Sequence, residues 1–126
     1  MTQAERQIRD SLERELNVRI GTPAGDDSVL EVPAAHKSVG PLRIRIDSDE
    51  ITVFVGPTHC HFTRYDGDPT EKRIADALEF VRDVLSDRMV LWSCLCAGGA
   101  YRTERGARFR VPWPVRRYVW SGPLAR

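Results

Sequence analysis

The stretch LRIRIDSDEITVFV, residues 42–55, decides the fold. Its first five residues alternate apolar and basic side chains, which is the period-two pattern of a strand with one buried face. Residues 47–50 form a polar turn, and residues 51–55 return as an apolar run rich in β-branched side chains. The stretch therefore predicts an antiparallel hairpin whose arms are residues 42–46 and 51–55.

A capping box begins the chain on the N-terminal side of this hairpin. Thr2 followed by Glu5 has the spacing in which each side chain bonds the other residue's backbone N–H. It opens a predicted helix to about Leu16, and residues 29–32 read as a short strand before the hairpin. The narrow apolar stripe of this helix places it at the surface of the domain, and its members are Ile8, Leu12 and Leu16.

A second capping signal follows the hairpin. Asp68 is the predicted N-cap, Pro69 occupies the first helical position, and Glu71 completes a capping box. The helix extends to about Asp87. Its apolar face is broad enough to pack across a sheet, because Ala77, Phe80 and Val84 widen a stripe made of Ile74, Leu78, Val81 and Leu85.

The C-terminal part is predicted to return to strands. Residues 89–96 form an apolar strand that the glycines at 98–99 bound. Residues 101–103 and 108–111 could pair as a hairpin, and residues 115–120 form a last strand.

This order of elements predicts one α+β domain over residues 1–126, with a mostly antiparallel sheet. The N-terminal and central helices are expected on one face of that sheet. The expected core residues share inward positions on the strands and the second helix: Ile44, Ile46, Val53, Val55, Ile74, Leu78, Val81, Leu85 and Leu91.

The composition is that of an ordinary globular protein of 126 residues, 41% hydrophobic and 29% charged. No run of 18 or more apolar residues suits a membrane span, so no membrane partner is expected. The charged N-terminus lacks an apolar signal segment, which predicts a cytoplasmic location. In that compartment the three cysteines are expected to be reduced thiols.

The net charge of +1 is unevenly distributed. Residues 1–101 hold 12 Lys and Arg against 17 Asp and Glu, whereas residues 102–126 hold seven Arg and one Glu. Residues 101–120, YRTERGARFRVPWPVRRYVW, interleave arginine with aromatic rings. Because arginine neutralises phosphate and rings stack on bases, single-stranded nucleic-acid binding is an alternative function, with contacts expected on Arg108, Arg110, Arg116 and Arg117.

The segment GPTHCHF, residues 56–62, concentrates two of the three histidines beside a cysteine. On an extended strand His59 and His61 point to one face, and Cys60 points to the other with Phe62. A zinc site with Cys94 and Cys96 is a second alternative, but H-x-H and C-x-C lack the usual ligand spacings. No metal site and no cofactor are predicted. No catalytic residue is predicted either, because on a strand the flanking imidazoles point away from the Cys60 thiol.

Residues 42–96 resemble small bacterial immunity-type proteins, which accompany polymorphic and contact-dependent toxins. Four features in order carry the resemblance: GPTHCHF at the end of a hairpin strand (56–62), a loop YDGD (65–68), a helix that ends in LSDR (85–88), and an apolar strand that begins with MV (89–90).

The resemblance implies a protein-binding inhibitor of a bacterial toxin domain with no chemistry of its own. The arginine-rich C-terminus has no counterpart in the pattern. The expected contact surface is the segment THCHFTRYDGD, residues 58–68, because recognition residues tend to occupy loops that rigid elements hold. Its predicted binding residues are His59, His61, Arg64, Tyr65 and Asp66.

Overall fold

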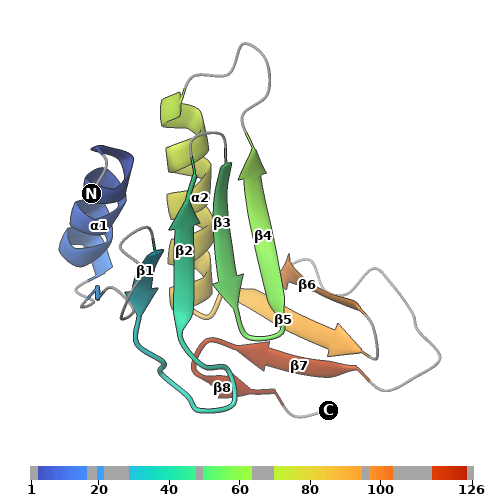
Figure 1. Cartoon of the computed structure of the whole chain (residues 1–126). Helices are drawn as coiled ribbons and strands as arrows, with labels where there is room; N and C mark the ends of the chain where they lie inside the picture. The colour runs from blue at the N-terminus through green and yellow to red at the C-terminus, as the bar shows by residue number, and fades with distance from the viewer. Residues whose placement is uncertain are drawn as a thin grey trace.

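The computed structural model describes residues 3–16, 20–21, 29–47, 50–63, 70–94, 97–103 and 115–124. These residues form helices and two antiparallel sheets, which confirms the predicted α+β class (Figure 1). In chain order the elements are α1 (Gln3–Leu16), β1 (Val29–Val32), β2 (Leu42–Ile46), β3 (Glu50–Val55), β4 (Thr58–Thr63), α2 (Thr70–Leu85), β5 (Met89–Cys94), β6 (Ala97–Arg102), β7 (Arg116–Val119) and β8 (Gly122–Pro123).

The first sheet has the strand order β1-β2-β3-β4, with every neighbouring pair antiparallel. The predicted hairpin is confirmed, because Ile44 of β2 lies opposite Val53 of β3 and Ile46 lies opposite Ile51. Strand β3 begins at Glu50, one residue earlier than predicted. The register keeps the apolar side chains of both arms on one face, as period-two alternation requires.

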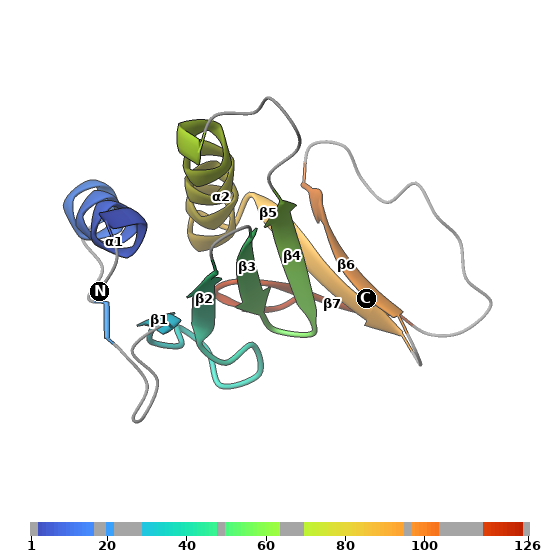
Figure 2. The same cartoon turned by 45° about the horizontal axis from the view of Figure 1, so that its top comes forward.

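Helix α2 covers that apolar face (Figure 2). Eight of the nine predicted core residues are buried, and Leu85 is the exception, since it is only partly buried and packs against the edge of the core. The most deeply buried side chains come from both layers, with Val53 at 0% and Val81 at 1% exposure. This part of the fold therefore has two layers, helix α2 and the first sheet.

Helix α1 lies beside α2 on the same side of the first sheet, as predicted (Figure 2). Its narrow stripe suffices to anchor it, because Ile8 and Leu12 are each 1% exposed. The predicted caps Thr2, Asp68 and Pro69 lie outside the described residues.

The strands that follow α2 form a second sheet, with the order β6-β5-β7-β8. The sequence predicted a single sheet and did not show this division. The prediction that glycines 98–99 bound a strand is wrong, because both lie inside β6, opposite Ser93 and Trp92 of β5. Residues 101–102 pair with 89–90 of β5, and the predicted second arm at 108–111 lies outside the described residues.

Close packing explains why glycines can continue this strand. A Cβ at Gly98 would lie 2.7 Å from the carbonyl oxygen of Pro57, in the turn between β3 and β4. A Cβ at Gly99 would lie 2.8 Å from the indole nitrogen of Trp92, which is its cross-strand partner. Because Gly98 has no side chain, the two sheets approach each other at one corner. Because Gly99 has none, the Trp92 indole packs directly on β6.

Gly98→Ala should destabilise the fold, because a backbone carbonyl occupies the space that its Cβ needs. We expect a loss of about 1–3 kcal/mol, the usual cost of overpacking, measured by urea unfolding. Gly21→Ala is the matched control, since no atom lies within 4 Å of its added Cβ, and it should be nearly neutral. Equal stabilities for the two variants would contradict the close approach of the sheets.

The C-terminus of α2 is tied to the second sheet by one residue in the left-handed conformation. Asp87 has a φ of 59°, its N–H donates to the Val84 carbonyl (3.1 Å), and the Arg88 N–H donates to the Asp83 carbonyl (2.8 Å). This is the Schellman pattern, here with aspartate where glycine is commonest. The Asp87 carboxylate accepts hydrogen bonds from the backbone N–H and the hydroxyl of Ser121, so it also holds the turn between β7 and β8.

A buried carboxylate makes a second tie at this end of α2. Asp83 is 5% exposed, and its oxygens lie 3.1 Å from a nitrogen of Arg88 and 3.2 Å from a nitrogen of Arg102 on β6. A buried charge is tolerated only when it is paired, so these arginines fix the helix end relative to β6.

Candidate functional site

The face of the first sheet opposite α2 carries the strongest concentration of chemically distinctive side chains. We call it the open face, because both helices lie on the other side of the sheet (Figure 2). The strand registers place these side chains on it: Glu31, Arg43, Arg45, Glu50, Thr52, Phe54, His59, His61 and Thr63.

One corner of the open face is a hydrogen-bonded polar cluster. Glu50 Oε1 accepts from the Thr63 hydroxyl at 3.1 Å and lies 3.1 Å from Nδ1 of His61. The Thr52 hydroxyl lies 3.4 Å from Glu50 Oε2 and 3.3 Å from the same His61 nitrogen. Thr52 is only 3% exposed although it is on the outer face, so its neighbours' side chains cover it.

This cluster favours the ionised carboxylate. The hydrogen bond from Thr63 is the largest cause that lowers the pKa of Glu50 below its ordinary value of 4.5, and His61 and Thr52 add to it. When His61 is protonated, its contact with Glu50 becomes an ion pair across neighbouring strands. The cluster therefore holds a negative charge in a defined place on an exposed surface.

An aromatic group lies next to this cluster. Phe54 is 41% exposed, unusual for a side chain of its size, and its ring centroid is 5.8 Å from that of His59. The rings of His59 and His61 meet edge-on, with centroids 4.8 Å apart. Three rings thus form a continuous exposed strip along β3 and β4.

Charged side chains border the strip on its other side. Arg43 lies opposite Phe54 in the ladder and pairs with Glu31 of β1, with 3.5 Å between Nε and Oε2. Arg45 lies 3.7 Å from the carboxylate of Asp47. Exposed pairs of this kind contribute little to stability, so both arginines are able to exchange their partners.

The structure confirms the predicted alternation of β4. His59 and His61 are exposed on the open face, whereas Cys60 and Phe62 are half-buried on the inner face. The other predicted binding residues, Arg64, Tyr65 and Asp66, lie outside the described residues. The sequence did not identify several members of the open face as binding residues: Glu50, Thr52, Phe54 and Thr63. The same alternation that predicts the hairpin also assigns them outward positions.

The inner face of β4 is a poor place for thiolate chemistry. Burial raises the pKa of the Cys60 thiol above its ordinary value of 9.0, so at neutral pH the protonated form predominates. Cys94 is half-buried on β5 of the other sheet, and Cys96 lies outside the described residues. Within the described ranges, no group of three or more His, Cys, Asp or Glu side chains is positioned to hold a metal ion.

No family model, no curated protein and no solved structure matches this chain. Among the described residues, neither helix has the length and apolar character needed to cross a bilayer.

The lowered pKa of Glu50 gives a prediction with a defined sign. Its ionised form stabilises the fold above the ordinary pKa of 4.5, and this contribution is lost as the pH falls through the lowered folded-state value. Glu50→Gln should therefore lower the thermal unfolding midpoint at neutral pH and leave it unchanged in acid well below 4.5. Differential scanning fluorimetry over a pH series measures this difference.

Glu13→Gln, at an exposed position of α1, controls for the loss of one negative charge. If Glu50→Gln lowers the unfolding midpoint equally at neutral and at acid pH, the ionised form of the Glu50 carboxylate is not what stabilises the fold.

Proposed function

We propose that this chain is a non-catalytic protein-binding domain, an immunity-type inhibitor that blocks a bacterial toxin domain through its open face. The observation that carries the proposal is the exposed strip of Phe54, His59 and His61 on a sheet face that neither helix covers. Aromatic side chains are what the centres of protein interfaces favour, and a sheet presents them at fixed positions.

The charges around the strip suit recognition by a protein. Arg43 and Arg45 lie on one side of Phe54, and the ionised Glu50 lies beside His61 on the other. A partner with complementary charges gains orientation and association rate, and a partner with like charges is rejected. The chain continues from β4 into Arg64, Tyr65 and Asp66, which extend the same mixture of residue types.

The proposal assigns no chemistry to Cys60, the described cysteine of the first sheet. Cys60 is half-buried on the inner side of β4, its thiol pKa is raised, and the flanking imidazoles are on the opposite side. A thiolate nucleophile needs a lowered pKa and a base directed at it.

The test is protection of cells and direct binding. The chain is co-expressed with the product of the toxin-like reading frame expected next to its gene, and surviving colonies are counted. The purified pair is then titrated by calorimetry. Phe54→Ala should weaken binding by about 2 kcal/mol, roughly thirtyfold in Kd, because a central exposed ring is removed without touching the core.

Gln7→Ala is the control, since it alters an exposed position on α1, away from the open face. It should protect cells as the native chain does. Full protection by a folded Phe54→Ala, His59→Ala double variant would place the contact elsewhere. Tight, salt-sensitive binding of single-stranded DNA or RNA that is lost when Arg116 and Arg117 are neutralised would favour the nucleic-acid alternative instead.

A further inference from the structure

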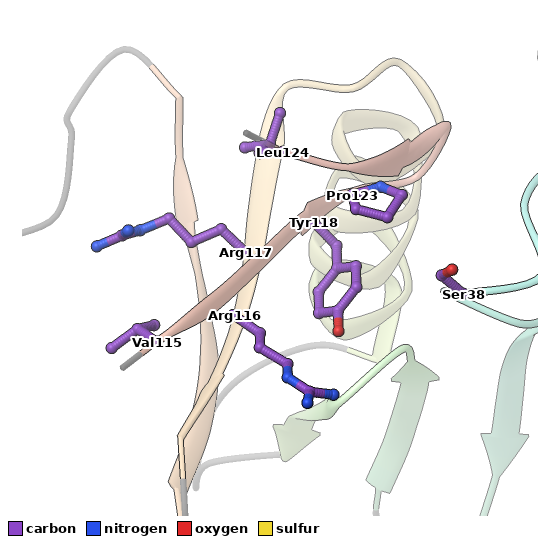
Figure 3. Close-up of a pocket in the computed structure, with 7 residues that line it drawn as sticks. All are labelled: Ser38, Val115, Arg116, Arg117, Tyr118, Pro123 and Leu124. Carbon is purple, nitrogen blue, oxygen red and sulfur yellow. The ribbon is translucent and has the colours of Figure 1, made fainter. Parts of the chain in front are cut away.

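A cavity of about 260 Å³ lies on a different part of the molecule, between Ser38, on the turn before β2, and the strands β7 and β8 (Figure 3). Arg116 and Tyr118 extend to the side of β7 on which Ser38 lies, whereas Arg117 extends to the opposite side. The ring of Pro123 lies next to the ring of Tyr118. A guanidinium, two hydroxyls and two rings thus surround one space.

The described lining of the cavity carries arginine and no carboxylate. Among the described residues, no aspartate or glutamate lines it, and neither Arg116 nor Arg117 forms an ion pair. The arginines elsewhere on the strands behave differently, since Arg43, Arg45 and Arg102 each lie within 4 Å of a carboxylate. Arg116 therefore has no carboxylate partner among the described residues.

The walls of the cavity are fixed before any ligand arrives. The Ser38 N–H donates to Nδ1 of His36 at 3.0 Å, which shapes the turn. Gly122 has a φ of 149°, and a Cβ there would lie 3.2 Å from the His36 ring, so β8 packs directly on this turn. The Leu124 N–H donates to the Arg117 carbonyl at 2.9 Å and extends the pairing of β7 with β8. A preformed site loses little entropy when it binds.

We propose that this cavity binds a small organic anion in which a phosphate is joined to a flat ring, that is, a nucleotide. The guanidinium of Arg116 pairs with phosphate oxygens through charge-assisted hydrogen bonds, the strongest class available to it. The hydroxyls of Ser38 and Tyr118 supply further donors, and the rings of Tyr118 and Pro123 offer a flat surface to the base. The cavity volume lies just below the usual range for drug-sized ligands, about 300–1,000 Å³, which suits one nucleotide unit.

The test is calorimetric titration of the purified full chain with adenosine monophosphate, and with adenosine and inorganic phosphate separately. The nucleotide should bind more tightly than either of its parts. Arg116→Gln should weaken it about tenfold or more, because the charge-assisted hydrogen bonds are lost. Ser38→Ala, at an exposed position, should weaken it by a smaller factor.

Arg45→Gln is the matched control. It removes the same charge from an exposed position on β2 that does not line the cavity, so it should change the affinity by less than about twofold. Equal losses for the two arginine variants would overturn the proposal, because they would indicate attraction by net charge alone. No heat of binding at millimolar nucleotide would also overturn it.

A further titration distinguishes a free nucleotide from the phosphorylated end of a nucleic-acid strand. A short single-stranded oligonucleotide with a terminal phosphate is titrated and then competed with adenosine monophosphate. Displacement in competition supports one nucleotide site for both sources. If the protein binds the oligonucleotide but not adenosine monophosphate, the cavity is not the binding site.

Discussion

The packing of α2 against two sheets is the constraint on which the rest of the structure depends. Its apolar face is buried in the same core as the inner face of the first sheet, where it contacts β3 and β4, and it also contacts β5. One helix can satisfy both sheets only if the chain turns sharply where the helix ends. Asp87 makes that turn in a left-handed conformation, and its carboxylate binds Ser121 at the far end of the second sheet. The position of β7 and β8, and with it the cavity beside Ser38, follows from this short connection.

The open face is a consequence of the same packing. Because side chains alternate along a strand, turning Ile44, Val53 and Val55 toward α2 turns Arg43 and Phe54 away from it. The period continues into β4, where it exposes His59 and His61 and half-buries Cys60. The chemistry available on each side of the first sheet is thus set by register, which explains why the thiol and the imidazoles do not act together.

The parts of the fold that could be predicted from the sequence are those that local periodicity controls. Alternation in residues 42–55 gave the hairpin and its buried face, and the capping signals around residue 70 located α2 to within two residues at each end. The same alternation predicted the faces of His59 and Cys60. The division into two sheets and the approach of Pro57 to Gly98 could not be predicted, because no local pattern in the sequence shows which strands pair or which residues meet. The cavity depends likewise on Ser38 and Arg116, which lie far apart in the sequence.

The exposed side chains of the open face contact one another. Arg43 pairs with Glu31, His59 meets Phe54, and the polar cluster around Glu50 closes on itself, while the apolar side chains beneath them face α2. Mutation can therefore rewrite this surface one residue at a time without disturbing what holds the chain folded. Two exceptions are Thr52, which is buried beneath its neighbours, and Glu50, whose ionised carboxylate is expected to stabilise the fold. A sheet of this kind is a scaffold on which natural selection can change specificity far faster than it changes architecture.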